Sequence, residues 1–271
     1  MRKIWQKMLP ANTFYRIACN VINLSNSSAT NRVAVIFRHL STMATPKVVK
    51  FESANKLGAC PGVLCGDPKK QPRGIIVLQE WWGVNQQIQE CGKDLCGRYD
   101  AVTLVPDLYR GKVAEDNETA GHYMGSLDWK GAVDDIRAAA KYLKEQGCKK
   151  VGVTGFCMGG ALSMAAAALI EEVDAAVPFY GIPSDQLCDV TKIKIPLQCH
   201  FAEKDDTKGF ASPDEFRPLE AKLKDANLKV LEFYVYPAGH AFTNTSGPNY
   251  NKECRDLAFS RMSEFFKKYL S

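Results

Sequence analysis

The chain has 271 residues, of which 46% are hydrophobic and 24% charged, an ordinary globular composition with enough length for one large core. No apolar run approaches the roughly 18 residues of a membrane span, and the ten cysteines are scattered without a C-x-x-C pair, which argues against a disulfide scaffold or a zinc module. We therefore expect an intracellular protein with reduced thiols, without metal or cofactor, and with no membrane partner.

The basic excess is confined to the N-terminus. The formal net charge is +5, but residues 1–50 contain no Asp or Glu, and six of the 35 Lys and Arg precede Met43, which leaves 29 against 30 acids. The body thus gives no electrostatic reason for a nucleic-acid partner. The composition of residues 1–43 is typical of an organellar transit peptide, and Arg38 shortly before Ser41 resembles a mitochondrial processing site. We predict a targeting leader over 1–43 that is disordered or removed and a mitochondrial location, with the chloroplast, or the cytoplasm after a start at Met43, as alternatives.

The body, residues 44–271, alternates predicted strands and helices without a repeat, linker or composition break. Continuous β-branched runs such as 74–79 predict parallel strands that are covered on both faces. In chain order we predict strands at 48–53, 74–79, 101–106, 151–156, 173–180, 195–201 and 228–236, helices at 84–99, 128–146, after Cys157, 213–226 and 252–270, a hairpin and loop at 60–68, and a polar loop at 111–126. This rhythm predicts a single α/β domain with a mostly parallel central sheet and helices on both faces.

The stretch 151–164 runs from an apolar strand through a cysteine into an alanine-rich helix. Gly155 and Gly159 stand two residues before and two after Cys157, a spacing typical of the nucleophile elbow of α/β-hydrolases. Such a turn lifts the sulfur above the carboxyl edge of the sheet, where the N-terminus of the next helix favours an anion. A structural cysteine on a βα turn is the alternative, because free cysteine is usually a small buried hydrophobe.

Two later loops carry groups that suit a nucleophilic thiol. Asp205 and Asp206 follow strand 195–201, and His240 follows strand 228–236, so all lie where functional residues of α/β sheets gather, at the carboxyl ends of strands. Nucleophile, acid and histidine also occur in the chain order of α/β-hydrolases. Histidine would take the thiol proton and the acid would orient it. Together these placements predict Cys-His-Asp chemistry.

Residues 44–271 resemble the dienelactone hydrolase (carboxymethylenebutenolidase) family of α/β-hydrolases. The matching motifs are Gln79-Glu80-Trp81-Trp82-Gly83-Val84-Asn85, Val105-Pro106-Asp107-Leu108-Tyr109, Gly155-Phe156-Cys157-Met158-Gly159-Gly160, Phe179-Tyr180-Gly181, Asp205 and Gly239-His240-Ala241-Phe242. The resemblance implies that Cys157 is the nucleophile, His240 the base and Asp205 the orienting acid. Asp205 is preferred to Asp206 because it ends the family's pattern over 200–205.

The resemblance also assigns supporting groups. Glu80 stands where the family has a glutamate that holds the resting thiol, and a carboxylate there would resist a second anion and keep the sulfur protonated. The alternative for Glu80 is a solvated residue at a strand end. The oxyanion hole would be formed by the backbone N–H groups of Trp81 and Met158.

The predicted substrate pocket departs from the family pattern. Family members hold a substrate carboxylate with two arginines, whereas here Arg110 lies one place from the expected position and Asn244 occupies the second. A bidentate clamp is therefore at best half present. Besides Arg110, we predict substrate contacts from Tyr109, Tyr180 and Phe242, with core packing as the alternative for some of these rings.

These observations favour a hydrolase that acts on carboxylic esters or lactones through a thioester intermediate. The alternative is a hydrolase-fold protein that binds a ligand or senses redox state through Cys157 without turnover. In either case the expected partner is a small molecule, and we expect a monomer or weak dimer.

Overall fold

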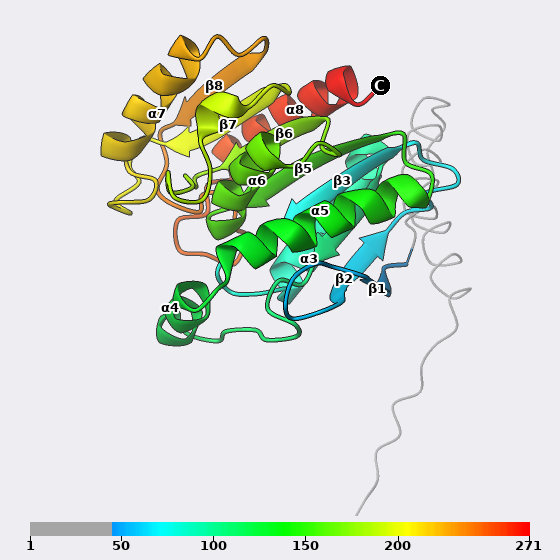
Figure 1. Ribbon diagram of the computed structural model, residues 1–271. Helices are drawn as coiled ribbons and strands as arrows, with labels where there is room; N and C mark the ends of the chain where they lie inside the picture. The colour runs from blue at the N-terminus through cyan, green and yellow to red at the C-terminus, as the bar shows by residue number, and fades with distance from the viewer. Residues whose placement is uncertain (1–44) are drawn as a thin grey trace, which may run out of the picture. The chain divides into compact units, whose positions relative to one another are not determined.

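The computed structural model describes residues 45–271, which form an eight-stranded sheet with helices on both faces (Figure 1). The strands are β1 (Lys47–Phe51), β2 (Cys60–Cys65), β3 (Arg73–Leu78), β4 (Val102–Pro106), β5 (Lys150–Phe156), β6 (Ala175–Phe179), β7 (Leu197–Ala202) and β8 (Leu231–Tyr236). Their order in the sheet is β1-β2-β4-β3-β5-β6-β7-β8. The hairpin of β1 and β2 pairs antiparallel with β4, and the remaining strands are parallel. The predicted leader lies outside the described residues.

The sheet separates two apolar layers, each of which is covered by helices. They are α3 (Gln86–Tyr99), α4 (Asn117–Gly125), α5 (Trp129–Glu145), α6 (Met158–Leu169), α7 (Pro213–Asp225) and α8 (Lys252–Tyr269), with a short 3₁₀ turn at Val190–Lys192. Helices α5, α6 and α7 bury their apolar residues on one face of the sheet, and α3 and α8 do so on the other. The central strands β3, β4 and β6 are buried except for Arg73 at the start of β3, which explains their continuous apolar runs. The predicted single α/β domain with a mostly parallel sheet is confirmed.

Three local predictions were wrong. The segment predicted as a hairpin and loop holds strand β2 over Cys60–Cys65. The carbonyl of Pro61 accepts the N–H of Asp107, and the strand pairs with β1 on one side and β4 on the other. The segment predicted as a polar loop at 111–126 contains α4. Only Ala120 of this helix is buried, so its sequence shows no apolar stripe. Asp116 caps the helix by accepting the N–H of Thr119. The last strand begins at Leu231 rather than 228.

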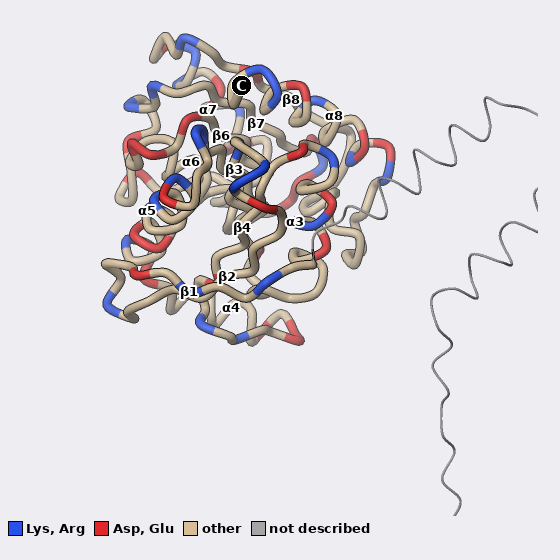
Figure 2. Tube along the Cα trace, turned by 90° about the vertical axis from the view of Figure 1, so that its right-hand side faces the viewer, with Lys and Arg blue, Asp and Glu red and all other residues tan. Residues whose placement is uncertain are grey.

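Charge is evenly mixed over the described chain. Figure 2 shows Lys and Arg interspersed with Asp and Glu along the outer segments. Within residues 45–271, no helix has the length and apolar character needed to cross a membrane. The same residues contain no group of three or more His, Cys, Asp or Glu side chains arranged to hold a metal ion.

Candidate active site

Cys157 forms the sharp turn between β5 and α6. Its backbone has φ 55° and ψ −116°, in the region that L-residues rarely adopt. The flanking glycines have no room for a side chain: a Cβ at Gly155 would lie 2.2 Å from the carbonyl oxygen of Gly159, and one at Gly159 would lie 2.5 Å from that of Leu78. Both contacts are with backbone atoms, which cannot move away. The Gly-x-Cys-x-Gly spacing is therefore a steric requirement of the turn.

The other side of the turn is equally crowded. A Cβ at Gly160 would lie 2.1 Å from the carbonyl oxygen of Phe179, and one at Gly181 would lie 2.0 Å from that of Cys157. The N–H of Cys157 donates to the carbonyl of Phe179 at 3.1 Å. Helix α6 thus begins directly against the end of β6. Its first N–H groups, that of Met158 among them, have no acceptor within the helix and are available to an anion.

His240 and Asp205 form a close pair. The distance from His240 Nδ1 to Asp205 Oδ2 is 2.7 Å, and the other oxygen of Asp205 accepts the N–H of Thr207 at 2.9 Å. Because a carboxylate is only an acceptor, Nδ1 carries the proton and Nε2 is left to accept one. Asp205 is buried whereas Asp206 is exposed, so the structure brings His240 together with the first of the two predicted acids.

The charge state of His240 reflects its neighbours. Burial lowers the pKa of the imidazole, but the hydrogen bond with Asp205 and the influence of the Cys157 thiol outweigh this and raise it to about 10. The charge state of His240 is therefore sensitive to both Asp205 and Cys157. An imidazole in this position favours removal of the thiol proton and stabilises the resulting imidazolium.

Glu80 is buried and forms hydrogen bonds with Asn244 and Tyr180. Asn244 Nδ2 donates to Glu80 Oε2 at 2.6 Å, and the Tyr180 hydroxyl lies 3.4 Å from Oε1. Burial raises the pKa of the Glu80 carboxyl, while the bonds from Asn244 and Tyr180 and the charge of His240 act in the opposite direction. Tyr180 also shares a short hydrogen bond of 2.5 Å with Thr243. The alternative of a solvated strand-end residue is wrong for Glu80, because only 4% of it is exposed.

The predicted aromatic residues occupy different positions. The ring of Tyr180 packs edge-on against His240 with centroids 5.2 Å apart, and Phe242 packs against Tyr180 at 5.5 Å. Neither ring has exposed surface, so both support His240 from within the core. Tyr109 is at the other side of the nucleophile, where its hydroxyl donates to the sulfur of Met158 at 3.1 Å. Trp81 is partly exposed and stacks edge-on with Trp82 at 5.2 Å.

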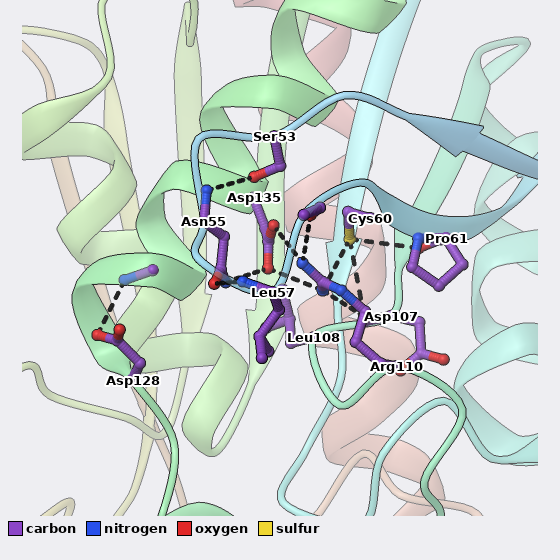
Figure 3. Close-up of polar contacts among 12 residues, drawn as sticks. Ser53, Asn55, Leu57, Cys60, Pro61, Asp107, Leu108, Arg110, Asp128 and Asp135 are labelled. Atoms are coloured by element: carbon purple, nitrogen blue, oxygen red, sulfur yellow. Dashed lines mark hydrogen bonds and ion pairs between the residues drawn. The ribbon is translucent and has the colours of Figure 1, made fainter.

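Arg110 forms an ion pair with Asp135. Its guanidinium forms two hydrogen bonds with the buried carboxylate of Asp135 on α5, at 2.8 and 2.9 Å (Figure 3). A third contact runs to the carbonyl of Gly58 at 3.1 Å. The donors that a substrate clamp would use are thus occupied by a protein carboxylate, and the substrate contact expected from Arg110 stays a prediction.

Sequence reasoning missed three partners of the predicted residues. Asn244 was noted only as a missing arginine, and its bond with Glu80 was not anticipated; Thr243 and Asp135 were not considered. Asn244 and Thr243 directly follow the Gly239-His240-Ala241-Phe242 motif, which is the one signal that could have placed them near His240. For Asp135, a charge within an amphipathic helix pattern, no sequence signal exists.

An eight-stranded α/β sheet with a cysteine on a strained strand-to-helix turn, followed in sequence by an acid and a histidine at later strand ends, defines the α/β-hydrolase class. The model of the Dienelactone hydrolase family matches residues 61–270. The chain belongs to this family of hydrolases.

Similar proteins support the assignment. "Protein usf" from Aquifex pyrophilus is 35% identical over 216 residues, which cover 75% of this chain and 91% of that protein. The carboxymethylenebutenolidase of Pseudomonas putida is 33% identical over 218 residues, covering 75% and 89%. Among solved structures, a putative dienelactone hydrolase from Klebsiella pneumoniae superposes with a TM-score of 0.71 at 22% identity, covering 83% of this chain and all of that one. This last likeness concerns the fold alone.

Proposed function

We propose that the protein hydrolyses carboxylic esters or lactones with Cys157 as the nucleophile. The observation that carries the proposal is the hydrogen-bonded pair of Asp205 and His240, whose pKa responds to Cys157, together with the strained backbone of the turn at Cys157. His240 takes the thiol proton as the sulfur attacks the substrate carbonyl. The oxyanion that forms is held by the N–H groups of Met158 and Trp81.

The second half of the reaction reuses the same residues. His240 returns its proton to the leaving alkoxide, and the acyl group remains on Cys157 as a thioester. Water then attacks the thioester while His240 accepts its proton, and the acid product leaves with the thiol restored. Asp205 accepts the Nδ1 proton in its hydrogen bond and so holds the tautomer in which Nε2 faces the sulfur.

The substrate class follows from the charges around the site. Asn244 donates its amide to Glu80, and the guanidinium of Arg110 is bound by Asp135. Neither of the two positions that resemble the family's arginines thus offers a cation to a substrate carboxylate. We therefore infer a preference for neutral esters and lactones over carboxylated dienelactones. This preference follows from Arg110 and Asn244 and not from family membership.

The experiment is to measure hydrolysis of a neutral aryl ester by the wild type, Cys157→Ala and Cys148→Ala. Cys148 is also a buried cysteine, and serves as the matched control. Cys157→Ala should lose at least about 10⁴-fold in kcat with its circular dichroism and melting unchanged, and Cys148→Ala should keep its activity. Retained turnover in Cys157→Ala would overturn the proposal. Specific, saturable ligand binding or reversible oxidation of Cys157 without any turnover in the wild type would favour the ligand-binding or redox-sensing alternative.

A further inference from the structure

The turn that follows β4 brings Tyr109 to the nucleophile and is fixed by several side chains. The N–H of Leu108 donates to the amide oxygen of Gln79 at 3.2 Å. The carboxylate of Asp107 accepts the N–H groups of Tyr109 and Gly111, at 3.1 and 2.5 Å. This segment therefore has a fixed backbone path at the point where the Tyr109 ring leaves it.

Arg110 is the strained residue of this turn. Its φ of 55° lies in the left-handed region, which a long L side chain adopts only when its surroundings hold it there. The guanidinium meets the Asp135 carboxylate with two parallel hydrogen bonds, and Nη1 also donates to the carbonyl of Asp107 at 3.0 Å. Asn55, from the loop between β1 and β2, donates to the same carboxylate at 2.9 Å (Figure 3). The Asp135 side chain has no exposed surface.

Contacts continue from this turn to the reacting atoms. The hydroxyl of Tyr109 donates to Met158 Sδ at 3.1 Å, and Met158 directly follows Cys157. Burial, with the charge of Cys157 as the second cause, raises the pKa of the Tyr109 hydroxyl, which therefore remains a donor throughout the working pH range. Asp135, Arg110, Tyr109 and Met158 thus form one continuous path from α5 to the start of α6.

We propose that Arg110 and Asp135 are positioning residues of the active site, whose ion pair holds Tyr109 against Met158 and so fixes the N–H that receives the oxyanion. This proposal rests on the proposed function, since it names the group that the ion pair positions. Neither residue touches the substrate. Arg110 holds Asp135 through two parallel hydrogen bonds. A lysine at this position could not form both, because its ammonium is a single point charge.

The competing explanation is a purely structural clamp between α5 and the turn. A clamp would affect activity only through the amount of folded protein, and its loss would be the same whether or not Tyr109 carries its hydroxyl. A positioning pair instead predicts coupling between Arg110 and Tyr109, which a double-mutant cycle measures directly.

The test is a cycle of the wild type, Arg110→Lys, Tyr109→Phe and the double variant, assayed with a neutral aryl ester. Arg110→Lys should lower kcat about tenfold to a hundredfold while KM changes less than about threefold, since the lost interaction stabilises the transition state. In the Tyr109→Phe background the same substitution should cost less than about threefold. Equal losses in both backgrounds would overturn the proposal.

Two further variants guard against a trivial loss of folding. Asp94→Asn breaks the comparable ion pair of Asp94 with Arg255, which joins α3 and α8 and whose arginine is similarly buried, and should leave kcat unchanged. Asn55→Ala removes one hydrogen bond to Asp135 and leaves the ion pair in place, so it should fold and lower kcat by about twofold to threefold, again only when Tyr109 is present. A loss that persists in the Tyr109→Phe background would contradict the proposal even if Arg110→Lys does not fold.

The cycle also has a readout that needs no turnover. The rate constant for alkylation of Cys157 by iodoacetamide reports the surroundings of the sulfur and can be measured in all four proteins. If the wild type hydrolyses no ester, the proposed function fails, and the alkylation cycle still decides whether Arg110 acts through Tyr109. Additive alkylation rates would refute the positioning role on their own.

Discussion

The turns at Cys157 and Arg110 both hold a non-glycine residue at φ 55° beyond the end of a parallel strand, yet they are maintained in different ways. The turn at Cys157 is held by backbone crowding: a Cβ at Gly155 would meet the carbonyl of Gly159, and one at Gly159 would meet the carbonyl of Leu78 at the end of β3. The turn at Arg110 is open at Gly111, where an added Cβ would meet nothing within 4 Å, and it depends on Asp135, 25 residues away. One turn is thus held by close backbone packing and the other by a side-chain ion pair.

The largest expected effect follows from this difference. Gly159→Ala should cost more than about 3 kcal/mol of unfolding free energy, because its Cβ would overlap carbonyl oxygens that cannot move. Gly111→Ala should cost only about 1–2 kcal/mol, because the new side chain meets no neighbour and only the left-handed backbone conformation is unfavourable for alanine. Urea denaturation of the two variants measures both values, with Gly125→Ala, which has ordinary φ and open space, as the control. Similar losses for Gly159→Ala and Gly111→Ala would show that the two turns are not held differently.

The same difference explains what the sequence could predict. The Gly-x-Cys-x-Gly spacing is visible because backbone crowding on both sides of Cys157 leaves room only for glycine at two fixed positions, and the β-branched run before Glu80 is visible because the strand is buried on both faces. His240 and Asp205 could be placed because they follow strands that end at one edge of the sheet. Arg110 could not be placed, since a cation beside Tyr109 looks the same whether it faces a substrate or Asp135. The bond between Asn244 and Glu80 joins residues 164 positions apart and leaves no local trace.

The acid that orients His240 provides the next comparison. Asp205→Asn should lower kcat about 10³- to 10⁴-fold, because the amide no longer fixes the tautomer, whereas Asp206→Asn at the neighbouring exposed position should change it less than twofold. Steady-state assays of the two variants decide this, and a larger loss from Asp206→Asn would reassign the acid.

The same pair of variants tests the electrostatics of His240. Its folded-state pKa is raised from 6.5 to about 10, mainly through Asp205 once burial has acted against it. Protonation of His240 therefore stabilises the fold fully below about pH 6.5, and this contribution is lost as the pH rises from 6.5 towards 10. In the wild type, unfolding free energy should fall over that window, and Asp205→Asn should flatten the fall while Asp206→Asn should not.

A smaller effect concerns substrate charge at Asn244. Asn244→Arg should raise kcat/KM for an anionic lactone roughly tenfold to a hundredfold, the value of one charge-assisted contact of about 1.5–3 kcal/mol, and should barely change it for a neutral ester. Thr245→Arg adds the same charge at an exposed neighbour and controls for general attraction. Because Asn244 already contacts Glu80, the new guanidinium has a competing partner, which favours the lower end of that range. A wild type that strongly prefers the anionic lactone would refute the inferred substrate class.

The central claim is that Cys157 carries the acyl group during turnover. The most direct measurement is intact-mass and peptide mass spectrometry of enzyme quenched in acid during reaction with a slowly hydrolysed aryl ester. We predict an added acyl mass on the peptide that contains Cys157, absent in Cys157→Ala and persisting longer in Asp205→Asn, where deacylation is slowed. Turnover of the ester without any acyl adduct on Cys157, or with the adduct on another residue, would contradict the account.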